Sequence, residues 1–268
     1  MTIGNFDGVH LGHQAILERV RAHGLAHALA PTVITFDPHP RAFFARRTGR
    51  PEKAPAQIST LRDKVQEVVR HGIQQLAVLR FDERLSSMSP ETFIEQLLVE
   101  GLNTRWLLVG EDFRYGHKRA GDIELLRQAG SRYGFEIETI ADVPDAAGQR
   151  ISSSNLREAL AAGDLDRAHA LLGYPYRLTS HVGHGQKIGR NIGYPTLNQP
   201  VPERFALRNG VYVVKVHGLS ERPLPGVASL GVRPTVTDTG RRVLETHLLD
   251  CDLDAYGKLA TVEFVRFL

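Results

Sequence analysis

The sequence of 268 residues predicts two folds in succession, an α/β domain with a doubly wound parallel sheet and then an antiparallel β-barrel. Over the first ~170 residues, strand-like segments alternate with segments whose apolar residues recur at helical spacing, which is typical of a parallel sheet covered by helices on both faces. From residue 174 onward, glycine and proline separate β-rich segments, which is typical of an antiparallel barrel. We therefore expect domains over residues 1–172 and 173–268.

The expected elements of the first domain follow from apolar periodicity and from helix start and stop signals. Ser89 and Pro90 supply a cap and a first-turn signal, whereas Gly72 and Gly101 end helical runs. A segment with two prolines and four basic residues, 46–56, is expected to be a mobile loop. The strands are predicted over residues 1–3, 31–36, 75–80, 106–110 and 135–140. Helices are predicted after the turn at 4–13 and over 59–72, 89–101, 123–133, 154–162 and 165–172.

The second domain is expected to consist of short strands. They are predicted over residues 176–183, 210–217, 224–230, 243–250 and 259–267, with a further strand-like segment around Thr196.

Composition limits the class of protein. Hydrophobic residues make up 42% and charged residues 24% of the chain, as in a folded globular protein. The net charge of +3 fits anionic small molecules and is too weak and scattered to indicate nucleic acid. The single cysteine, Cys251, cannot form an internal disulfide, and no apolar run approaches the ~20 residues of a membrane span. We expect a cytoplasmic protein with no membrane or nucleic-acid partner; the sequence does not indicate an oligomeric state.

Residues 4–13, Gly-Asn-Phe-Asp-Gly-Val-His-Leu-Gly-His, carry the most informative pattern. His10 and His13 lie three residues apart where a turn with glycines at positions 4, 8 and 12 meets a helix. Glycines let backbone amides approach an anion, and the helix N-terminus adds positive potential. At this spacing the two imidazoles lie on one face of the first turn and can contact the same triphosphate. The pattern favours a phosphate site over a loop that is merely rich in histidine and glycine.

A second anion site is indicated where a predicted helix begins. Ser153 and Ser154 supply hydroxyls and backbone N–H groups there, and Arg157 adds a charged fork one turn later. Read alone, the same segment favours a plain helix cap with a solvated arginine over an anion site.

Three features of the second domain suit phosphates and a cation. The glycine-rich basic loop at 183–190 can wrap phosphates, although it does not match the P-loop pattern. Thr196 and Asn198 alternate on a strand-like segment, so their oxygens can reach one Mg²⁺ or can simply face solvent. Glu245 places one carboxylate in an apolar-leaning strand, where an ordinary solvated role is the alternative.

The segment at 4–13 resembles that of the HxGH nucleotidylyltransferases, and its longer form is similar to that of the bacterial bifunctional riboflavin kinase/FMN adenylyltransferases, or FAD synthetases. Further blocks resemble this family in the family's order, with Asp37 in place of Glu, Ser154 in place of Thr and Leu197 in place of Ala. These blocks are Phe-Asp-Pro-His-Pro at 36–40, Gly-Glu-Asp-Phe-Arg-Tyr-Gly at 110–116, Arg-Ile-Ser-Ser-Ser-Asn-Leu-Arg at 150–157, Pro-Thr-Leu-Asn at 195–198, Gly-Val-Ala-Ser-Leu-Gly-Val-Arg-Pro-Thr at 226–235 and Leu-Glu-Thr-His-Leu-Leu-Asp at 244–250.

The resemblance implies a role for each matching residue. Catalytic roles fall on His10, His13, Arg157 and Glu245. ATP binding falls on Gly4, Phe6, Gly8, Gly12, Arg150, Ser153, Ser154, Gly183, Gly185, Lys187 and Gly189. Flavin binding falls on Pro38, Pro40, Asp112 and Arg233, and Mg²⁺ binding on Thr196 and Asn198.

The resemblance also implies two consecutive reactions that use ATP, riboflavin to FMN and then FMN to FAD, with Mg²⁺ present and FMN and FAD as product ligands. Two alternatives remain open: an adenylyltransferase with another acceptor and an accessory barrel, and a flavin-binding protein with one or both sites inactive. Members of the family usually start earlier and continue past the last strand into a helix. We therefore expect a barrel truncated at its C-terminus and kinase activity weaker than adenylyltransferase activity.

Overall fold

The computed structural model describes residues 1–145, 147–184, 195–232, 242–249, 251 and 253–268. The chain forms two compact units. The first contains Met1–Pro55 and Val65–Arg150, and the second contains Ala56–Lys64 and Ile151–Leu268. The sequence did not indicate that Ala56–Lys64 belongs with the C-terminal part of the chain. The boundary predicted between two functional domains, at residues 172 and 173, stays a prediction.

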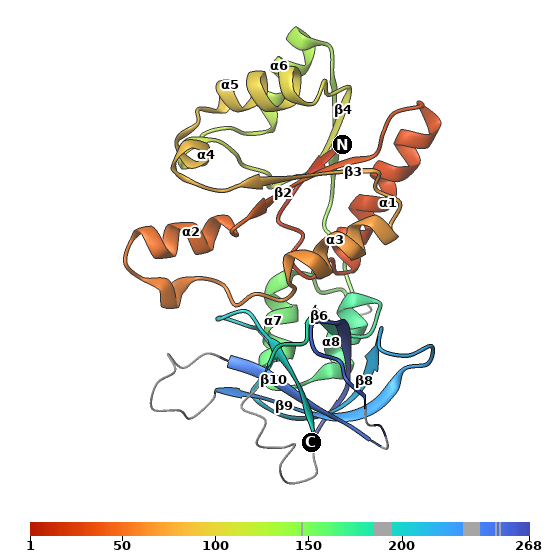
Figure 1. Ribbon diagram of the computed structural model, residues 1–268. Helices are drawn as coiled ribbons and strands as arrows, with labels where there is room; N and C mark the ends of the chain where they lie inside the picture. Colours follow the sequence, from red (N-terminus) through yellow and green to blue (C-terminus); the bar gives the residue numbers. More distant parts are fainter. Residues whose placement is uncertain (146, 185–194, 233–241, 250, 252) are drawn as a thin grey trace. The chain divides into compact units, whose positions relative to one another are not determined.

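A five-stranded parallel sheet forms the centre of the first unit (Figure 1), as the sequence predicts. Its strands lie in the order β3-β2-β1-β4-β5, so the chain winds to one edge and then returns to the other side of β1. In such a sheet, ligands bind beyond the carboxyl ends of the strands where the winding direction changes. The strands are β1 (Thr2–Ile3), β2 (Thr32–Asp37), β3 (Gln75–Arg80), β4 (Trp106–Gly110) and β5 (Glu136–Ile140).

Helices cover both faces of this sheet because its inner strands are apolar on both sides. On one face, Val33 and Leu108 pack in the same cluster as Leu17 of α1 (Leu11–Ala26) and Val68 of α3 (Leu61–Arg70). Consecutive strand residues point to opposite faces. Burial of each such side chain contributes about 1.5–3 kcal/mol.

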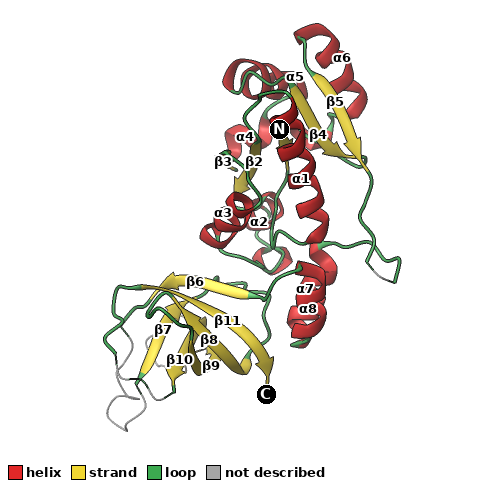
Figure 2. Ribbon diagram, turned by 90° about the vertical axis from the view of Figure 1, so that its right-hand side faces the viewer, coloured by secondary structure: helices red, strands yellow, loops and turns green. Residues whose placement is uncertain are grey.

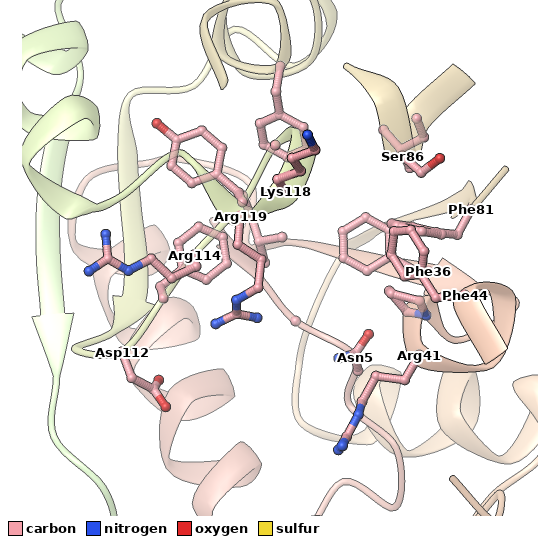
Figure 3. A pocket seen from close by; sticks show the side chains of 18 residues that line it. Asn5, Phe36, Arg41, Phe44, Phe81, Ser86, Asp112, Arg114, Lys118 and Arg119 are labelled. Carbon is pink, nitrogen blue, oxygen red and sulfur yellow. The ribbon is translucent and has the colours of Figure 1, made fainter. Parts of the chain in front are cut away.

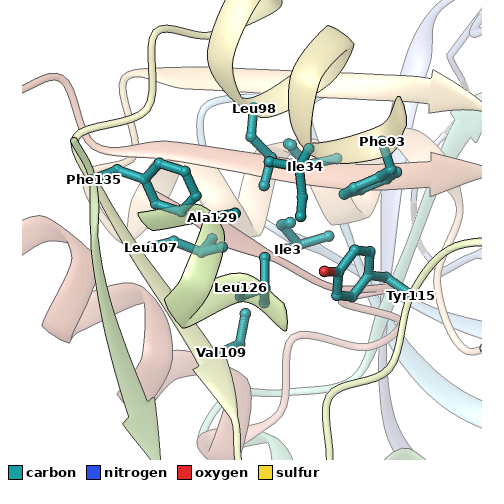
Figure 4. Close-up of a cluster of buried hydrophobic side chains, with 11 residues drawn as sticks. Ile3, Ile34, Phe93, Leu98, Leu107, Val109, Tyr115, Leu126, Ala129 and Phe135 are labelled. Atoms are coloured by element: carbon teal, nitrogen blue, oxygen red, sulfur yellow. The ribbon is translucent and has the colours of Figure 1, made fainter. Parts of the chain in front are cut away.

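Ile34 and Leu107 therefore point to the other face and pack in a second cluster (Figure 4). There they lie with Phe93 of the π-helical segment η2 (Phe93–Gly101) and Leu126 of α6 (Ile123–Tyr133). The residues before η2 form only one turn of α-helix, α5 (Pro90–Thr92). The sequence predicted one continuous helix here.

Short elements occupy the loops at the carboxyl ends of the strands. The sequence did not predict α2 (Pro40–Arg47), which starts with proline and is capped by the His39 imidazole, whose Nδ1 accepts from the Arg41 backbone at 3.1 Å. This helix and the 3₁₀ turn η1 (Pro51–Lys53) take up part of segment 46–56, which the sequence predicts to be a mobile loop. The remaining short elements are α4 (Glu83–Ser87) and η3 (His117–Arg119).

The second unit is an antiparallel six-stranded barrel preceded by two helices (Figure 2). Its strand order is β6-β11-β8-β9-β10-β7, with antiparallel pairing throughout, as the sequence predicts. The helices are α7 (Ser153–Ala162) and α8 (Leu165–Leu172). The strands are β6 (Arg177–His181), β7 (Thr196–Pro200), β8 (Gly210–His217), β9 (Leu224–Val232), β10 (Arg242–Leu248) and β11 (Leu259–Phe267).

The barrel closes where its two edge strands, β6 and β7, meet. The fully buried amide of Gln199 on β7 donates from Nε2 to the carbonyl of Ser180 on β6 at 3.1 Å and to that of Ala260 on β11 at 2.9 Å. The backbone N–H of Gly183 also donates to the carbonyl of Asn198 at 2.7 Å. One side chain of the edge strand β7 therefore bonds to carbonyls of both β6 and its neighbour β11 and links the two ends of the sheet.

Asp63 is a buried carboxylate that joins the segment Ala56–Lys64 to the barrel. It is 5% exposed, and it accepts hydrogen bonds from the Thr60 hydroxyl at 2.7 Å and the Thr179 backbone at 3.0 Å. Burial raises the pKa of Asp63, and the hydrogen bonds from Thr60 and Thr179 oppose that rise. The carboxylate is retained inside the protein because donors surround it.

We expect Asp63→Ala to lower the free energy of unfolding by about 2–3 kcal/mol, because it leaves the Thr179 N–H without its acceptor. Urea denaturation followed by circular dichroism measures this, with Asp166→Ala on the exposed side of α8 as the control. Since the folded chain binds the Asp63 proton more tightly than the unfolded chain, the parent should gain stability over Asp63→Asn as pH falls from about 7 to about 4. An unchanged difference across this range would contradict the buried role.

Candidate active site

The turn that follows β1 has a strained backbone. Phe6, Gly8 and Val9 have φ angles of 46°, 86° and 33°. Glycine adopts such angles easily, whereas they cost other residues about 1–2 kcal/mol and are least favourable for a β-branched side chain. Phe6 and Val9 are 1% and 0% exposed and pack in the cluster that contains Leu17 of α1. Strain that packing maintains in this way is typical of functional sites.

The structure places His10 and His13 together at the start of α1. The Nδ1 atom of His10 accepts a hydrogen bond from the His13 backbone at 3.3 Å and so caps the helix. The two imidazole rings stack, with centroids 3.7 Å apart and planes 15° apart, and the Phe6 ring lies 5.0 Å from that of His13. Both rings therefore lie where the N-terminus of a 16-residue helix attracts anions. Because Nδ1 of His10 accepts, the neutral ring carries its proton on Nε2.

The predicted glycines play different parts in this turn. Gly8 is the one with a left-handed backbone, and at Gly4 a Cβ atom would lie 2.9 Å from the Phe6 ring. Gly12 lies within the first turn of α1. Their predicted contact with ATP, and that of Phe6, stays a prediction.

A cavity of about 650 Å³ opens at the carboxyl ends of β1, β2 and β4 (Figure 3). Its volume is that of a site for a drug-sized ligand. Pro40 and Asp112, two of the predicted flavin residues, line it, whereas Pro38 precedes α2 and is not among the lining residues. The cavity is lined by Ile3, Gly4, Asn5, Phe36, Pro40, Arg41, Phe44, Phe81, Leu85, Ser86, Phe93, Asp112, Phe113, Arg114, Tyr115, Gly116, Lys118 and Arg119.

Arg150, predicted to bind ATP, forms ion pairs with two carboxylates of the first unit. Its Nε lies 3.1 Å from Asp142, and its Nη2 lies 3.5 Å from Asp112. All three side chains are more than half exposed, so each pair contributes little to stability. The contact links Asp112 on the cavity to the segment that follows β5.

The serine-rich segment does begin a helix, as predicted. Ser152 is the cap of α7, and its hydroxyl accepts from the Asn155 backbone at 3.2 Å, so Ser153 and Ser154 occupy the first helical turn. Arg157 donates from Nε to the carbonyl of Ala56 at 2.6 Å within the second unit. The sequence-based expectation that these residues bind the same triphosphate as His10 stays a prediction.

The barrel brings the predicted kinase residues onto neighbouring strands. Glu245 on β10 lies directly opposite Asn198 on β7, and His247 lies opposite Thr196. Directly opposed residues of an antiparallel pair point to the same face, so these four side chains share one face. The Asn198 amide is 7% exposed, and its Nδ2 donates to the Thr196 carbonyl at 3.2 Å. Leu197 points to the opposite face, as the alternation predicts.

His247 is a candidate that the sequence analysis did not single out. Its Nδ1 lies 3.0 Å from the carbonyl of Pro195, directly before Thr196. Since a carbonyl can only accept, Nδ1 carries the proton, and the ring restrains the start of β7. The sequence signal that could have found His247 is its position in the Leu-Glu-Thr-His block at 244–247.

Four predicted residues lie outside the described part of the chain: Gly185, Lys187, Gly189 and Arg233. Gly183 is described, and it pairs with Asn198 at the closure of the barrel. Within the described ranges, no group of three or more His, Cys, Asp or Glu side chains could hold a metal ion. No described helix is long and apolar enough to cross a membrane.

Comparisons with known families match both units. The family model described as FAD synthetase matches residues 1–155, and the model described as riboflavin kinase matches residues 172–268. The bifunctional riboflavin kinase/FMN adenylyltransferase of Escherichia coli K12 is 43% identical over 258 residues, which cover 96% of this chain and 80% of the relative. This chain belongs to the bifunctional riboflavin kinase/FMN adenylyltransferase family.

Other members of this family match this chain over a similar length. The Pseudomonas fluorescens enzyme of the same name is 43% identical over 98% of this chain and 82% of its own length, and that of Haemophilus influenzae is 40% identical over 98% and 83%. A crystal structure of a macrolide-efflux protein from Streptococcus pneumoniae matches with a TM-score of 0.80 and 27% identity, over 100% of this chain and 85% of that one. That likeness supports the two-unit fold.

For a member of this family, the cavity residues Arg41, Phe44, Phe81, Lys118 and Arg119 are candidates that sequence reasoning missed. The signals were a pair of phenylalanines soon after the proline-rich strand end and two consecutive basic residues after Gly116. Both follow strands of the parallel sheet, which is where ligands bind.

Two substitutions at His10 separate its capping role from chemistry. Asparagine is a good N-cap, so His10→Asn should keep the helix cap, whereas His10→Ala should lose about 1 kcal/mol of stability. Both remove the imidazole, and both should slow FAD formation from FMN by about 100-fold or more. Urea unfolding and chromatographic assay of FAD measure the two effects. Full activity in His10→Asn would show that His10 acts only as a cap.

Proposed function

We propose that this chain phosphorylates riboflavin to FMN in its barrel unit and adenylylates FMN to FAD in its α/β unit, with ATP as the donor in both steps. One observation carries the proposal: each unit holds a cluster of residues that suits one of the two steps. The stacked His10 and His13 lie at the carboxyl end of β1, and Glu245 lies in register with Asn198 beside Thr196. The substrates are therefore riboflavin, FMN and ATP.

In the adenylyltransferase step, a phosphate oxygen of FMN attacks the α-phosphorus of ATP. The new P–O bond forms as the bond to pyrophosphate breaks, so no protein nucleophile is required. His10 and His13 donate to the α-phosphate and to the leaving group. Arg157 belongs to the second unit, and its part in this step stays a prediction from the family resemblance. Catalysis in this unit then consists of positioning and of stabilising negative charge.

In the kinase step, the Glu245 carboxylate accepts the proton of the ribityl 5′-hydroxyl as that oxygen attacks the γ-phosphorus of ATP. The bond between the β- and γ-phosphates breaks, and ADP leaves. Glu245 is part-buried, and Asn198 lies opposite it, so the carboxylate is held on a strand rather than on a loop. His247 restrains the Pro195–Thr196 backbone beside it.

The donor set on this face fits Mg²⁺. A hydroxyl, an amide oxygen and a carboxylate are the hard oxygen ligands that Mg²⁺ prefers, and Mg²⁺ usually binds through one or two protein groups together with substrate phosphates. Thr196 and Asn198 would hold the ion, which when bound neutralises charge on the phosphates of ATP.

Two alternatives are weaker. An adenylyltransferase with an accessory barrel has no need for Thr196, Asn198 and Glu245 to share one face. A flavin-binding protein with inactive sites has no need to retain these three residues together with both histidines of the turn.

Incubation with riboflavin, ATP and Mg²⁺, followed by chromatography, tests the proposal. The parent should yield both FMN and FAD, because each product needs one of the two sites. Glu245→Gln should lower FMN formation by about 100-fold or more, since it removes the proton acceptor, and should leave the conversion of added FMN to FAD unchanged. Recovery of riboflavin alone from the parent would overturn the proposal.

Thr196→Val tests the magnesium assignment. It keeps the shape of the side chain and removes one oxygen, so the Mg²⁺ concentration that gives half-maximal riboflavin phosphorylation should rise about tenfold. FAD formation from FMN should not change.

Thr246→Val is the matched control on the opposite face of the neighbouring strand. The Thr246 hydroxyl is fully buried and makes no hydrogen bond within the described residues, so its loss should leave the Mg²⁺ requirement unchanged. An equal Mg²⁺ requirement in Thr196→Val and Thr246→Val would contradict a ligand role for Thr196.

A further inference from the structure

The cavity of the first unit has an aromatic part and a cationic part (Figure 3). The rings of Phe36 and Phe81 pack edge-to-face, with centroids 5.8 Å apart, and Phe44 lies 5.8 Å from Phe81. In Figure 3 the guanidinium groups of Arg41 and Arg119 extend away from these rings, toward the edge of the cavity where Asn5 lies. A ligand that fills the cavity therefore needs a flat apolar end and an anionic end.

Two of the charged residues that line the cavity have partners of opposite charge. Arg114 lies 3.0 Å from Asp122, which caps α6, so it adds little to the charge that a ligand would meet. Asp112, the only acidic residue among those that line the cavity, lies 3.5 Å from Arg150. It shares that arginine with Asp142 and keeps part of its negative charge.

Three cations on the cavity lining are not balanced in this way. Arg41, Lys118 and Arg119 form no ion pair with any residue that the structure describes. All three side chains are exposed, so water screens their mutual repulsion, and together they attract an anion that binds at the cavity. The arrangement fits a dianion such as a phosphate monoester.

The backbone that presents two of these cations is itself strained. Lys118 and Arg119 have φ angles of 54° and 59°, next to Gly116 at 70°. Two consecutive left-handed residues other than glycine are rare, and each costs about 1 kcal/mol. A simple surface turn would avoid this cost, so the geometry favours a functional placement of these side chains.

Asn5 marks the boundary between the two parts of the cavity. Its side-chain oxygen is buried and accepts no hydrogen bond within the described residues. A buried acceptor without a donor costs about 1–3 kcal/mol. A hydroxyl group of a bound ligand would satisfy it, as the polyol chain between a flavin ring and its phosphate can.

We propose that Arg41 and Arg119 bind the phosphate group of FMN and so make this cavity select FMN over riboflavin. This inference rests on the proposed adenylyltransferase function of the first unit. FMN consists of a ring, a hydroxylated chain and a phosphate, and the cavity offers a matching group for each: phenylalanines, Asn5 and the two arginines. Charge-assisted contacts to a phosphate then supply the selection, because the ring and the chain are common to both flavins.

The test compares FMN with 5′-deoxyriboflavin, a flavin that carries no phosphate and cannot be phosphorylated. We expect Arg119→Ala and Arg41→Ala each to raise the KM for FMN in FAD formation by about 10- to 100-fold, with a smaller change in kcat. Inhibition of the same reaction by 5′-deoxyriboflavin should stay as in the parent, and so should the KM for ATP. Arg119→Lys should recover part of the loss, because it keeps the charge.

Arg127→Ala, which removes an exposed arginine of α6 away from the cavity, is the matched control and should leave all constants unchanged. The unchanged KM for ATP in FAD formation reports that the first unit of each variant is folded. If the KM for FMN stays within about twofold of the parent, the phosphate assignment is wrong. If inhibition by 5′-deoxyriboflavin weakens equally, the arginines support the aromatic wall instead, which also overturns it. Failure of the parent to form FAD would instead overturn the proposed function.

Discussion

The burial of Phe6 and Val9 is the constraint on which the first unit's site depends. Their packing against α1 fixes a turn that the backbone alone would not adopt. Because the turn is fixed, α1 starts at a defined point after β1, with His10 as its cap and the helix N-terminus beside the carboxyl end of the sheet. Core packing therefore places His10 and His13, the candidate phosphate-binding residues, at the point where a doubly wound sheet binds ligands.

The barrel positions its candidate site residues through the register of strand pairing and not through a strained backbone. Alternation along β7 directs Leu197 and Gln199 to the inner face and Asn198 to the outer face. The inner face closes the barrel through the Gln199 amide, and the outer face pairs Asn198 with Glu245. A slip of one residue would exchange the two faces, so the closure and the candidate kinase site depend on the same pairing.

Sequence reasoning predicted the features that periodicity and local signals determine. The parallel sheet, the barrel, the stacked pair His10 and His13 and the shared face of Thr196 and Asn198 all follow from spacing. It did not predict α2, because the helix has only eight residues and two of its apolar residues, Pro40 and Phe44, line a cavity. It also could not pair Arg150 with Asp112 or give Ala56–Lys64 to the second unit, since both depend on contacts between residues distant in sequence.

The two candidate sites therefore differ in how strongly they depend on the side chains packed around them. Where loops carry the chemistry, a buried side chain such as Val9 can alter the site without touching the substrate, because it maintains a backbone that is otherwise unfavourable. Where strands carry it, hydrogen-bonded pairing holds Glu245 and Asn198 in place, so a neighbouring side chain acts only if it shifts the register or the closure at Gln199. Changes in the core of the first unit should therefore reach its chemistry more readily than changes of similar size in the barrel.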